Sequence, residues 1–143
     1  MKKPFMLISI MFLVALLGCT KNEIRGNGEV ITLDINEARE FIDEKRTGLL
    51  YIKSPYQSRE KEEAYYIEEL ESISKKEKLN ILLFDTSQYN GDHTELGLKQ
   101  HSRTLAFYQK GEIKAELDFS NLSKEQIPAA IHTFIESIRN EYY

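Results

Sequence analysis

The stretch YIKSPYQSREKEEAYY, residues 51–66, is the strongest indication of the fold because it joins a strand pattern to a helix pattern across one proline. It begins inside LLYIK, residues 49–53, whose nearly continuous apolar run is typical of a strand buried on both faces of a sheet. After Pro55 the pattern becomes helical and continues to about Lys76, with one side formed by Ala64, Ile67, Leu70 and Ile73 or Ser74. We therefore expect a buried strand that leads directly into a long helix.

The start of this helix carries three residues that favour helix initiation. Ser54 can act as the N-cap, because its hydroxyl can accept a hydrogen bond from an unpaired N–H group of the first turn. Pro55 suits the first helical position, where its missing N–H group would have no partner in any case. Gln57 can reach back to complete a capping box. The pattern predicts that the helix begins at Pro55.

Strands and helices alternate on either side of this stretch in the first part of the domain. EVITLD, residues 29–34, predicts a short strand, and INEAREFIDEKRTG, residues 35–48, predicts a helix that is closed by its glycine. LNILLFD, residues 79–85, is apolar on both faces, which favours a central strand covered by helices. This alternation predicts two parallel connections.

The second part of the domain has a different pattern. TELGLKQH, residues 94–101, predicts one short helix, and residues 104–119 predict two strands joined at a Lys-Gly pair. Ser123 and Gln126 form a second capping-box pattern ahead of a last helix. The apolar stripe of that helix comprises Ile127, Ala130, Ile131, Phe134, Ile135 and Ile138. We expect an antiparallel hairpin followed by a helix that docks on the sheet.

The order of these elements resembles that of a thioredoxin-like domain. GLLYIKSPYQSREKEEAYYIEEL, residues 48–70, is similar to the strand, active-site turn and helix of thioredoxin-like proteins, especially small secreted bacterial ones such as bacteriocin-transport accessory proteins. SRTLAFYQKGEIKAEL, residues 102–117, resembles the later strand pair of the family. The resemblance implies one α/β domain over residues 29–143, a thioredoxin-like three-layer sandwich with a mixed central sheet and helices on both faces.

The same resemblance indicates which functional residues of the family are replaced in this chain. The two cysteines of the family's C-x-x-C motif fall near Gln57 and Glu60, neither of which can exchange thiols. The cis-proline of the family falls on Arg103 before Thr104. A cis peptide bond before a residue other than proline costs about 2.5–4 kcal/mol, so we expect a trans peptide bond in this loop. The resemblance therefore implies a redox-inactive domain without a cofactor or an assigned catalytic residue.

The N-terminus has the pattern of a lipoprotein signal peptide over residues 1–18. Its apolar run, residues 5–17, would span about 20 Å as a helix, well short of the roughly 30 Å hydrocarbon core of a bilayer. Cys19 then resembles the lipobox cysteine of bacterial lipoproteins, which receives a diacylglyceryl group. The residues that carry this pattern are Lys2, Lys3, Leu16, Leu17 and Gly18. The alternatives are a plain secretory signal with a chance cysteine, or a buried apolar strand.

Lipidation of Cys19 would use the only cysteine of the chain and leave no thiol for redox chemistry or metal binding. Residues 19–28 comprise this cysteine and a polar, glycine-bearing segment, which predicts a flexible tether. We expect membrane lipid to hold the protein on the extracytoplasmic face of the cell membrane. A composition rich in Lys, Ile, Glu and Asn without Trp suggests a Gram-positive bacterium.

Charge and motifs argue against several classes of function. The formal net charge is −4, and lysines are interleaved with glutamates, so the sequence has no basic footprint for nucleic acid. His93 and His101 lie near Asp92 and Glu95, but their spacing matches no metal-binding motif. The sequence contains neither a G-x-S-x-G nucleophile elbow nor a glycine-rich phosphate loop. We expect no nucleic acid partner, no metal and no enzyme activity.

The first functional hypothesis is a binding or accessory module that presents the former active-site surface to another protein of the cell envelope. A helix N-terminus and nearby arginines offer donors for a carboxylate or a peptide backbone. The candidate partner-binding residues are Tyr56, Gln57, Arg59, His101 and Arg103. Roles in secretion, immunity and surface exclusion all fit this hypothesis. The alternatives are a thiol-independent enzyme or small-ligand-binding protein that uses the same cleft, and a structural envelope protein.

Overall fold

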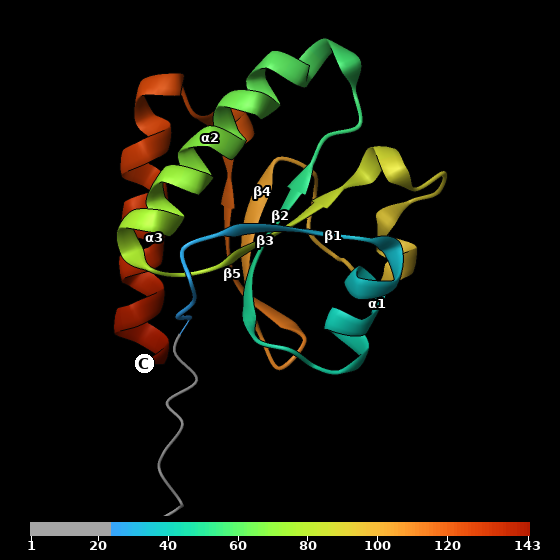
Figure 1. Cartoon of the computed structure of the whole chain (residues 1–143), viewed down its shortest axis with the longest axis horizontal. Helices are drawn as coiled ribbons and strands as arrows, with labels where there is room; N and C mark the ends of the chain where they lie inside the picture. The colour runs from blue at the N-terminus through green and yellow to red at the C-terminus, as the bar shows by residue number, and fades with distance from the viewer. Residues whose placement is uncertain (1–23) are drawn as a thin grey trace, which may run out of the picture.

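The computed structural model describes residues 24–143, which form a five-stranded sheet with helices on both faces (Figure 1). The predicted signal peptide and Cys19 lie outside the described residues. The strands run in the order β1-β3-β2-β4-β5 across the sheet. Their bounds are Val30–Leu33 (β1), Gly48–Lys53 (β2), Ile81–Asp85 (β3), Thr104–Gln109 (β4) and Glu112–Asp118 (β5).

The sheet is mixed, as predicted. β1 and β2 both pair with β3 in parallel, whereas β4 pairs antiparallel with β2 and with β5. The predicted hairpin connects β4 and β5 through Lys110 and Gly111, whose φ angles are 53° and 79°. Positive φ at both central residues is the geometry of a tight turn that matches the twist of the two strands. The connection between these strands is therefore confirmed.

Three helices cover the two faces of the sheet. α2, Glu60–Glu77, and α3, Ile127–Tyr142, lie together on one face, and α1, Ile35–Asp43, lies on the other (Figure 1). Alternate residues of β2 serve the two layers, because successive side chains of a strand point to opposite faces. Leu49 and Tyr51 pack in the cluster under α2 and α3, whereas Leu50 and Ile52 pack in the cluster under α1. The prediction of a three-layer α/β sandwich is confirmed.

Short 3₁₀ turns complete the chain. Their bounds are Gln57–Arg59, Thr86–Gln88, His93–Leu96, Phe119–Asn121 and Lys124–Gln126. The capping box predicted before the last helix is present, with the Ser123 backbone N–H donating to Gln126 Oε1 at 2.9 Å. No helix within residues 24–143 is long and apolar enough to cross a membrane.

The predicted start of α2 is wrong by five residues. Ser54 and Pro55 precede a 3₁₀ turn, and the α-helix begins at Glu60. Ser54 does not cap this helix, because its Oγ accepts a 3.4 Å hydrogen bond from the Tyr56 backbone N–H. Ser54 is also buried, with an exposure of only 4%. The serine hydroxyl is therefore used to shape the turn between β2 and α2, which a capping pattern alone does not distinguish from a helix start.

The apolar side predicted for α2 is also shifted. The buried residues of the helix are Glu63, Tyr66, Leu70, Ile73 and Ser74, whereas Ala64 is exposed. Leu70, Ile73 and Ser74 are buried, in agreement with the prediction. In the first two turns of the helix, however, Glu63 and Tyr66 face the sheet. The reason is a polar contact under the helix, because Glu63 receives a hydrogen bond from Tyr51 of β2.

The flexible tether predicted over residues 19–28 is wrong for residues 24–28, which pack against the domain. Ile24 is only 9% exposed and belongs to the core under α2 and α3. The Gly26 backbone N–H donates to the Lys78 carbonyl at 3.0 Å. Asn80 Oδ1 accepts the backbone N–H groups of Gly28 and Glu29 at 3.2 and 3.3 Å. The polar composition of residues 24–28 predicts a flexible segment, but the Asn80 side chain supplies a hydrogen-bond acceptor for its backbone N–H groups.

Candidate functional site

The polar surface at the carboxyl ends of the parallel strands is the candidate functional site. Lys53 at the end of β2 is in register with Asp85 at the end of β3, and the turn into α2 follows Lys53 directly. The loop before β4 joins the same edge, because the Arg103 backbone N–H donates to the Ile52 carbonyl at 2.6 Å. We call this surface, formed by residues 53–60, 85–87 and 101–103, the rim.

A shallow depression of about 220 Å³ lies in the rim. Its lining includes Lys53, Tyr56, Gln57, Glu60 and Ser87. Tyr56 is 65% exposed, although it carries a large aromatic ring. The depression therefore combines an exposed aromatic side chain with charged and amide groups, which is a composition suited to contact with another polar surface.

One wall of the depression is held by an ion pair. Lys53 Nζ lies 2.7 Å from Asp85 Oδ2, and both side chains are about a quarter exposed. Burial opposes ionisation of Asp85, but hydrogen bonds from Lys53 and Ser87 outweigh it and lower the pKa of this carboxyl. Thr86 Oγ1 donates to the Lys53 carbonyl at 2.7 Å, which ties the two strand ends together. The ends of β2 and β3 are thus a rigid support.

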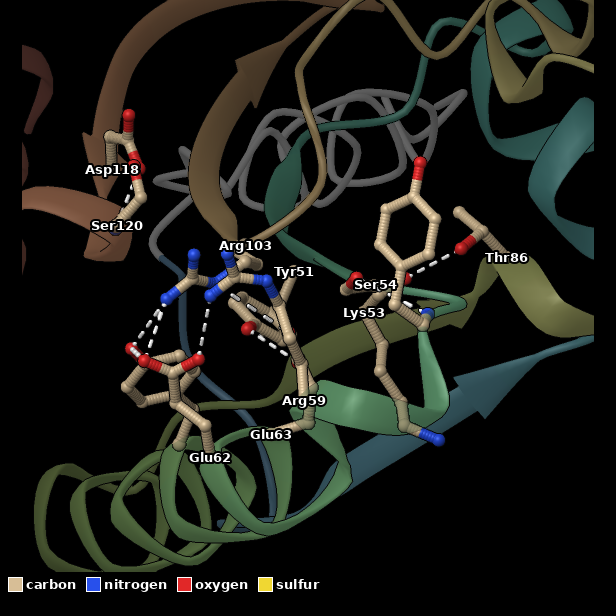
Figure 2. Close-up of polar contacts among 12 residues, drawn as sticks. Tyr51, Lys53, Ser54, Arg59, Glu62, Glu63, Thr86, Arg103, Asp118 and Ser120 are labelled. Carbon is tan, nitrogen blue, oxygen red and sulfur yellow. Dashed lines mark hydrogen bonds and ion pairs between the residues drawn. The ribbon is translucent and has the colours of Figure 1, made fainter.

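A network of side chains lies beneath the start of α2. We call it the Arg103 cluster, and it consists of Tyr51, Glu62, Glu63, Tyr66 and Arg103. Arg103 Nη2 contacts Glu62 Oε1 and donates to the Tyr66 hydroxyl, both at 2.9 Å. The Tyr66 hydroxyl in turn donates to Glu62 Oε1 at 3.0 Å. Figure 2 shows the guanidinium groups of Arg59 and Arg103 converging on Glu62.

Glu63 is the deepest charged group of this cluster and has no exposed surface. Its Oε2 accepts the Tyr51 hydroxyl at 2.8 Å, and its Oε1 lies 3.9 Å from Arg103 Nε. Neither Glu63 Oε1 nor Arg103 Nε has a hydrogen-bond partner within the described chain. Burial raises the pKa of Glu63, although the Tyr51 hydrogen bond and the Arg103 charge oppose the rise. Glu63 is therefore a carboxyl group that resists ionisation.

The backbone of Arg103 is unusual as well. Its φ is +66°, a left-handed conformation that is unfavourable for a residue with a Cβ atom. No cis peptide bond occurs within residues 24–143, in agreement with the trans loop expected at this position. The Arg103 carbonyl accepts the Phe119 backbone N–H at 2.9 Å, and the Phe119 ring packs 5.4 Å from the Tyr51 ring and 5.1 Å from that of Tyr66. Arg103 is thus fixed through both its backbone and its side chain.

The structure divides the predicted partner-binding residues into two groups. Tyr56, Gln57, Arg59 and His101 are exposed on the rim, and Arg59 Nη1 pairs with Glu62 Oε2 at 3.0 Å. Arg103 is only 9% exposed, and its guanidinium is directed into the cluster rather than toward solvent. Arg103 is therefore a positioning residue under the rim, because its side chain is buried and its Nη2 is engaged by Glu62 and Tyr66. Gln57 and Glu60, on which the sequence resemblance would place two cysteines, lie at the exposed start of the helix region.

Sequence reasoning missed Glu63, although one signal pointed to it. Tyr51 lies in the middle of a strand that is buried along most of its length, and a buried tyrosine hydroxyl usually has a hydrogen-bond partner. The helix that follows the strand was the nearest source of such a partner. The histidines form no comparable cluster: His93 Nε2 lies 2.7 Å from the Gln100 carbonyl, and residues 24–143 contain no group of three potential metal ligands.

Replacing Glu63 with glutamine is expected to change how stability depends on pH. The pKa of Glu63 is raised above its ordinary 4.5 in the folded protein, so the folded state binds this proton more tightly than the unfolded state. The stability from this proton is fully present below the ordinary pKa and is lost as pH rises through the folded pKa. Glu63→Gln removes that loss. Urea denaturation of both proteins across this range measures the difference.

Other carboxyl groups of the protein have the opposite pH dependence. The pKa values of Asp85 and Asp118 are lowered in the fold, so their contributions are lost as pH falls. These groups are present in both proteins and cancel in the comparison. If wild type and Glu63→Gln lose or gain stability in parallel from acid to neutral pH, the raised pKa of Glu63 is wrong.

Comparison with known proteins identifies the fold. No protein-family model matches the chain, and no curated protein sequence matches it. Solved structures do match. The J-Trx1 fragment of ERdj5 superimposes with a TM-score of 0.51 and 14% sequence identity, over 77% of this chain and 53% of the fragment. Oxidised thioredoxin O1 from Arabidopsis thaliana superimposes with a TM-score of 0.50 and 13% identity, over 80% of this chain and 98% of that protein.

Both superpositions cover most of the described domain. The chain spans only about half the length of the ERdj5 fragment, and both identities are far below the level that carries function. The fold is that of thioredoxin.

Proposed function

We propose that this chain is a lipid-anchored thioredoxin-like protein without thiol redox activity, which binds another protein of the cell envelope through its rim. The observation that carries the proposal is Tyr56. Among the described residues, it and Ile31 are the exposed large hydrophobic side chains, with exposures of 65% and 37%. Tyr56 stands at the depression in the rim, over a rigid support. An exposed aromatic side chain on a fixed scaffold is typical of a binding surface.

The proposed anchor is supported by the sequence around Cys19. Charged residues, an apolar run and the small residue before the cysteine occur in the order typical of a lipoprotein signal. A diacylglyceryl group inserts two acyl chains, and each buried methylene contributes about 0.8 kcal/mol, so that two chains give stable attachment where one gives marginal attachment. The same modification uses the only sulfur nucleophile of the chain. The absence of thiol exchange follows from this proposal.

The rim is suited to protein binding because its exposed groups stand on fixed elements. The Arg103 cluster holds the start of α2 against β2, and the Lys53–Asp85 ion pair holds the strand ends. Arg59 and Glu62 are partly exposed at the edge of this support, where a partner could contact their ion pair. A preorganised surface loses less conformational entropy on binding than a mobile loop. The partner that fits best presents peptide or carboxylate groups to an aromatic ring and an arginine.

A double variant, Tyr56→Ala with Gln57→Ala, is expected to reduce recovery of the envelope partner by about tenfold or more. The reason is that an aromatic side chain at the centre of an interface commonly contributes about 2 kcal/mol or more to binding. The measurement is in-cell crosslinking and affinity capture of the full-length protein from membranes. Quantitative mass spectrometry compares the variant with wild type.

Two controls make this experiment specific. Ile31→Ala removes the other large hydrophobic side chain that is exposed among residues 24–143 and should leave capture unchanged, because β1 is at the edge of the sheet away from the rim. Cys19→Ala should release the protein from membranes and reveal whether the anchor is needed. Equal capture by wild type and the Tyr56 and Gln57 variant would show that the rim is not the binding surface and would favour a small-molecule role for the depression.

A further inference from the structure

Three turns and the first described residues meet at the end of the sheet opposite the rim. The register places Ile81 at the start of β3 beside Leu49 at the start of β2, and Leu49 beside Phe107 near the end of β4. The turns before β3, before β2 and after β4 therefore lie at one end of the domain. Ile24, the first described residue, packs at the same end through the hydrogen bond between Gly26 and Lys78. We call this end the base.

Each of the three turns at the base contains a lysine in the left-handed conformation. Lys45, Lys78 and Lys110 have φ angles of 53°, 51° and 53°. Together with Arg103 they are the only described residues other than glycine with positive φ. The turns of Lys45 and Lys110 touch each other, because the Gly111 backbone N–H donates to the Arg46 carbonyl at 3.0 Å.

A lysine is an unexpected residue at such positions. Glycine and asparagine adopt the left-handed conformation more readily, because a Cβ atom clashes there and asparagine can compensate by local hydrogen bonding. Lys45 and Lys78 follow the ends of α1 and α2, where a positive charge complements the helix dipole. Lys110 has no such explanation, because it lies in a hairpin between two strands. The property that the three positions share is a positive charge at the base.

The lysines of the base are free to meet an external negative surface. Lys45, Lys75, Lys76, Lys78 and Lys110 are all exposed, and none forms an ion pair with another residue of the described chain. Some neighbouring carboxylates are engaged by other cations, namely Glu44 by Arg46, Glu112 by Lys114, and Glu77 by Arg139. Glu29 and Asp43 at the same end form no ion pair within residues 24–143. The base therefore presents more exposed lysines than carboxylates outside these ion pairs, although the whole chain is acidic.

The position of the proposed anchor brings the base to the membrane. Four residues separate Cys19 from the buried Ile24, so the chain between them can reach at most about 17 Å. α2 runs from the rim to Lys78 at the base, and its 18 residues correspond to about 27 Å. A short link at the base holds that end close to the lipid surface and leaves the rim at the far end.

We propose that the base of the domain docks on anionic phospholipid headgroups through Lys45, Lys78 and Lys110. This inference rests on the lipidation of Cys19 proposed above. One lipid anchor and a cluster of basic side chains are two membrane signals that act together. Docking turns the rim away from the bilayer, so the partner of the rim is a protein, or a protein domain, that reaches the far side of the lipoprotein.

The test uses the full-length lipoprotein in nanodiscs of phosphatidylcholine, with or without phosphatidylglycerol, that carry a headgroup-linked quencher. A fluorophore is placed on the base through Asn27→Cys or on the rim through Ser58→Cys, both at exposed positions. We expect strong quenching of the base fluorophore in anionic discs, weak quenching in neutral discs, and little quenching of the rim fluorophore in either. High salt should remove the difference between the discs.

The decisive variant replaces Lys45, Lys78 and Lys110 together with asparagine, which tolerates positive φ and lacks the charge. Each lysine near an anionic surface changes the docked population by about fivefold, so the triple variant should lower the docked-to-undocked ratio about a hundredfold. A control with the same loss of charge replaces Arg59, Lys61 and Lys124, which are exposed near the rim end of α2, and should dock like wild type. Thermal unfolding confirms that both triple variants are folded.

Three results would overturn docking at the base. They are equal quenching in neutral and anionic discs, no effect of the base variant, and an equal effect of the control variant. The mass of the Cys19 peptide is measured in the same samples and separates the two proposals. A lipidated protein whose base is not quenched overturns the docking alone, whereas an unmodified Cys19 overturns the anchor and the docking with it. Neither result changes the test of the rim by Tyr56 and Gln57.

Discussion

Replacing Arg103 with alanine is expected to lower the free energy of unfolding by about 3–5 kcal/mol near neutral pH, because it removes the cation of a buried charged network. Glu63 would then lie fully buried at 0% exposure without the guanidinium charge of Arg103 beside it. Tyr66 would also lose the donor that Arg103 Nη2 supplies. The left-handed backbone is not relieved, since alanine also has a Cβ atom. Chemical denaturation followed by tyrosine fluorescence measures the loss, because the chain has no tryptophan.

The matched control is Arg59→Ala, which removes a second arginine from the same carboxylate. Arg59 pairs with Glu62 at 3.0 Å, but its side chain is 45% exposed, so its removal should cost about 0.5 kcal/mol or less. The difference between the stability losses of Arg103→Ala and Arg59→Ala therefore measures the effect of burying the arginine side chain. The cost of Arg103→Ala should also shrink at low pH, where protonation neutralises Glu63. Similar losses for both variants would mean that the Arg103 cluster is not a buried network in solution.

Replacing Phe119 with alanine is expected to cost about 3–5 kcal/mol as well, for a different reason. Phe119 is fully buried, and its ring packs against the rings of Tyr51 and Tyr66. Its removal leaves a cavity whose walls are the two tyrosines that bind Glu63 and Arg103. Water can enter such a polar-walled space, so the change weakens the ionic contacts in addition to the packing. Denaturation of the single variant, analysed as for Arg103, gives the cost.

Phe119→Leu is the conservative control, because it keeps an apolar side chain of intermediate size and should retain most of the stability. The double variant with Arg103→Ala adds a further test. Because the Phe119 ring packs on the tyrosines that contact Glu63 and Arg103, the two losses should not add. A double variant whose loss equals the sum of the single losses would show that Phe119 and the cluster are independent.

Much of the fold was predictable because its signals are local. The apolar run at residues 49–53, the hairpin at Lys110-Gly111 and the capping box of Ser123 each depend on residues that are close in the chain. Periodicity then distinguishes strands from helices, and the order of the elements restricts the topology to a few choices. The thioredoxin-like order of the elements follows from such signals, although the sequence identity to the two solved structures is only 13–14%.

The errors have a common physical origin in contacts made across the fold. Ser54 lies in a sequence that is typical of a helix N-cap, but its hydroxyl accepts a hydrogen bond within the turn between β2 and α2 instead. Ala64 has the spacing of a core residue, but the rotation of α2 about its axis depends on what the sheet offers. The hydroxyl of Tyr51 offers a hydrogen bond there, and Glu63 is therefore turned inward. Residues 24–28 pack because of Asn80, more than fifty positions away.

From the sequence alone one can read the order of strands and helices, the single cysteine, and the polar Gln57 and Glu60 on which the resemblance to thioredoxin-like proteins would place two thiols. These are properties of composition and of neighbours in the chain. Tertiary packing, in contrast, sets the inward direction of Arg103, the exposure of Tyr56 and the gathering of three lysines at the end opposite the rim. Arg103 meets Tyr66 from 37 positions away. A side chain's direction depends on the packing and charge of such distant partners, which no local pattern records.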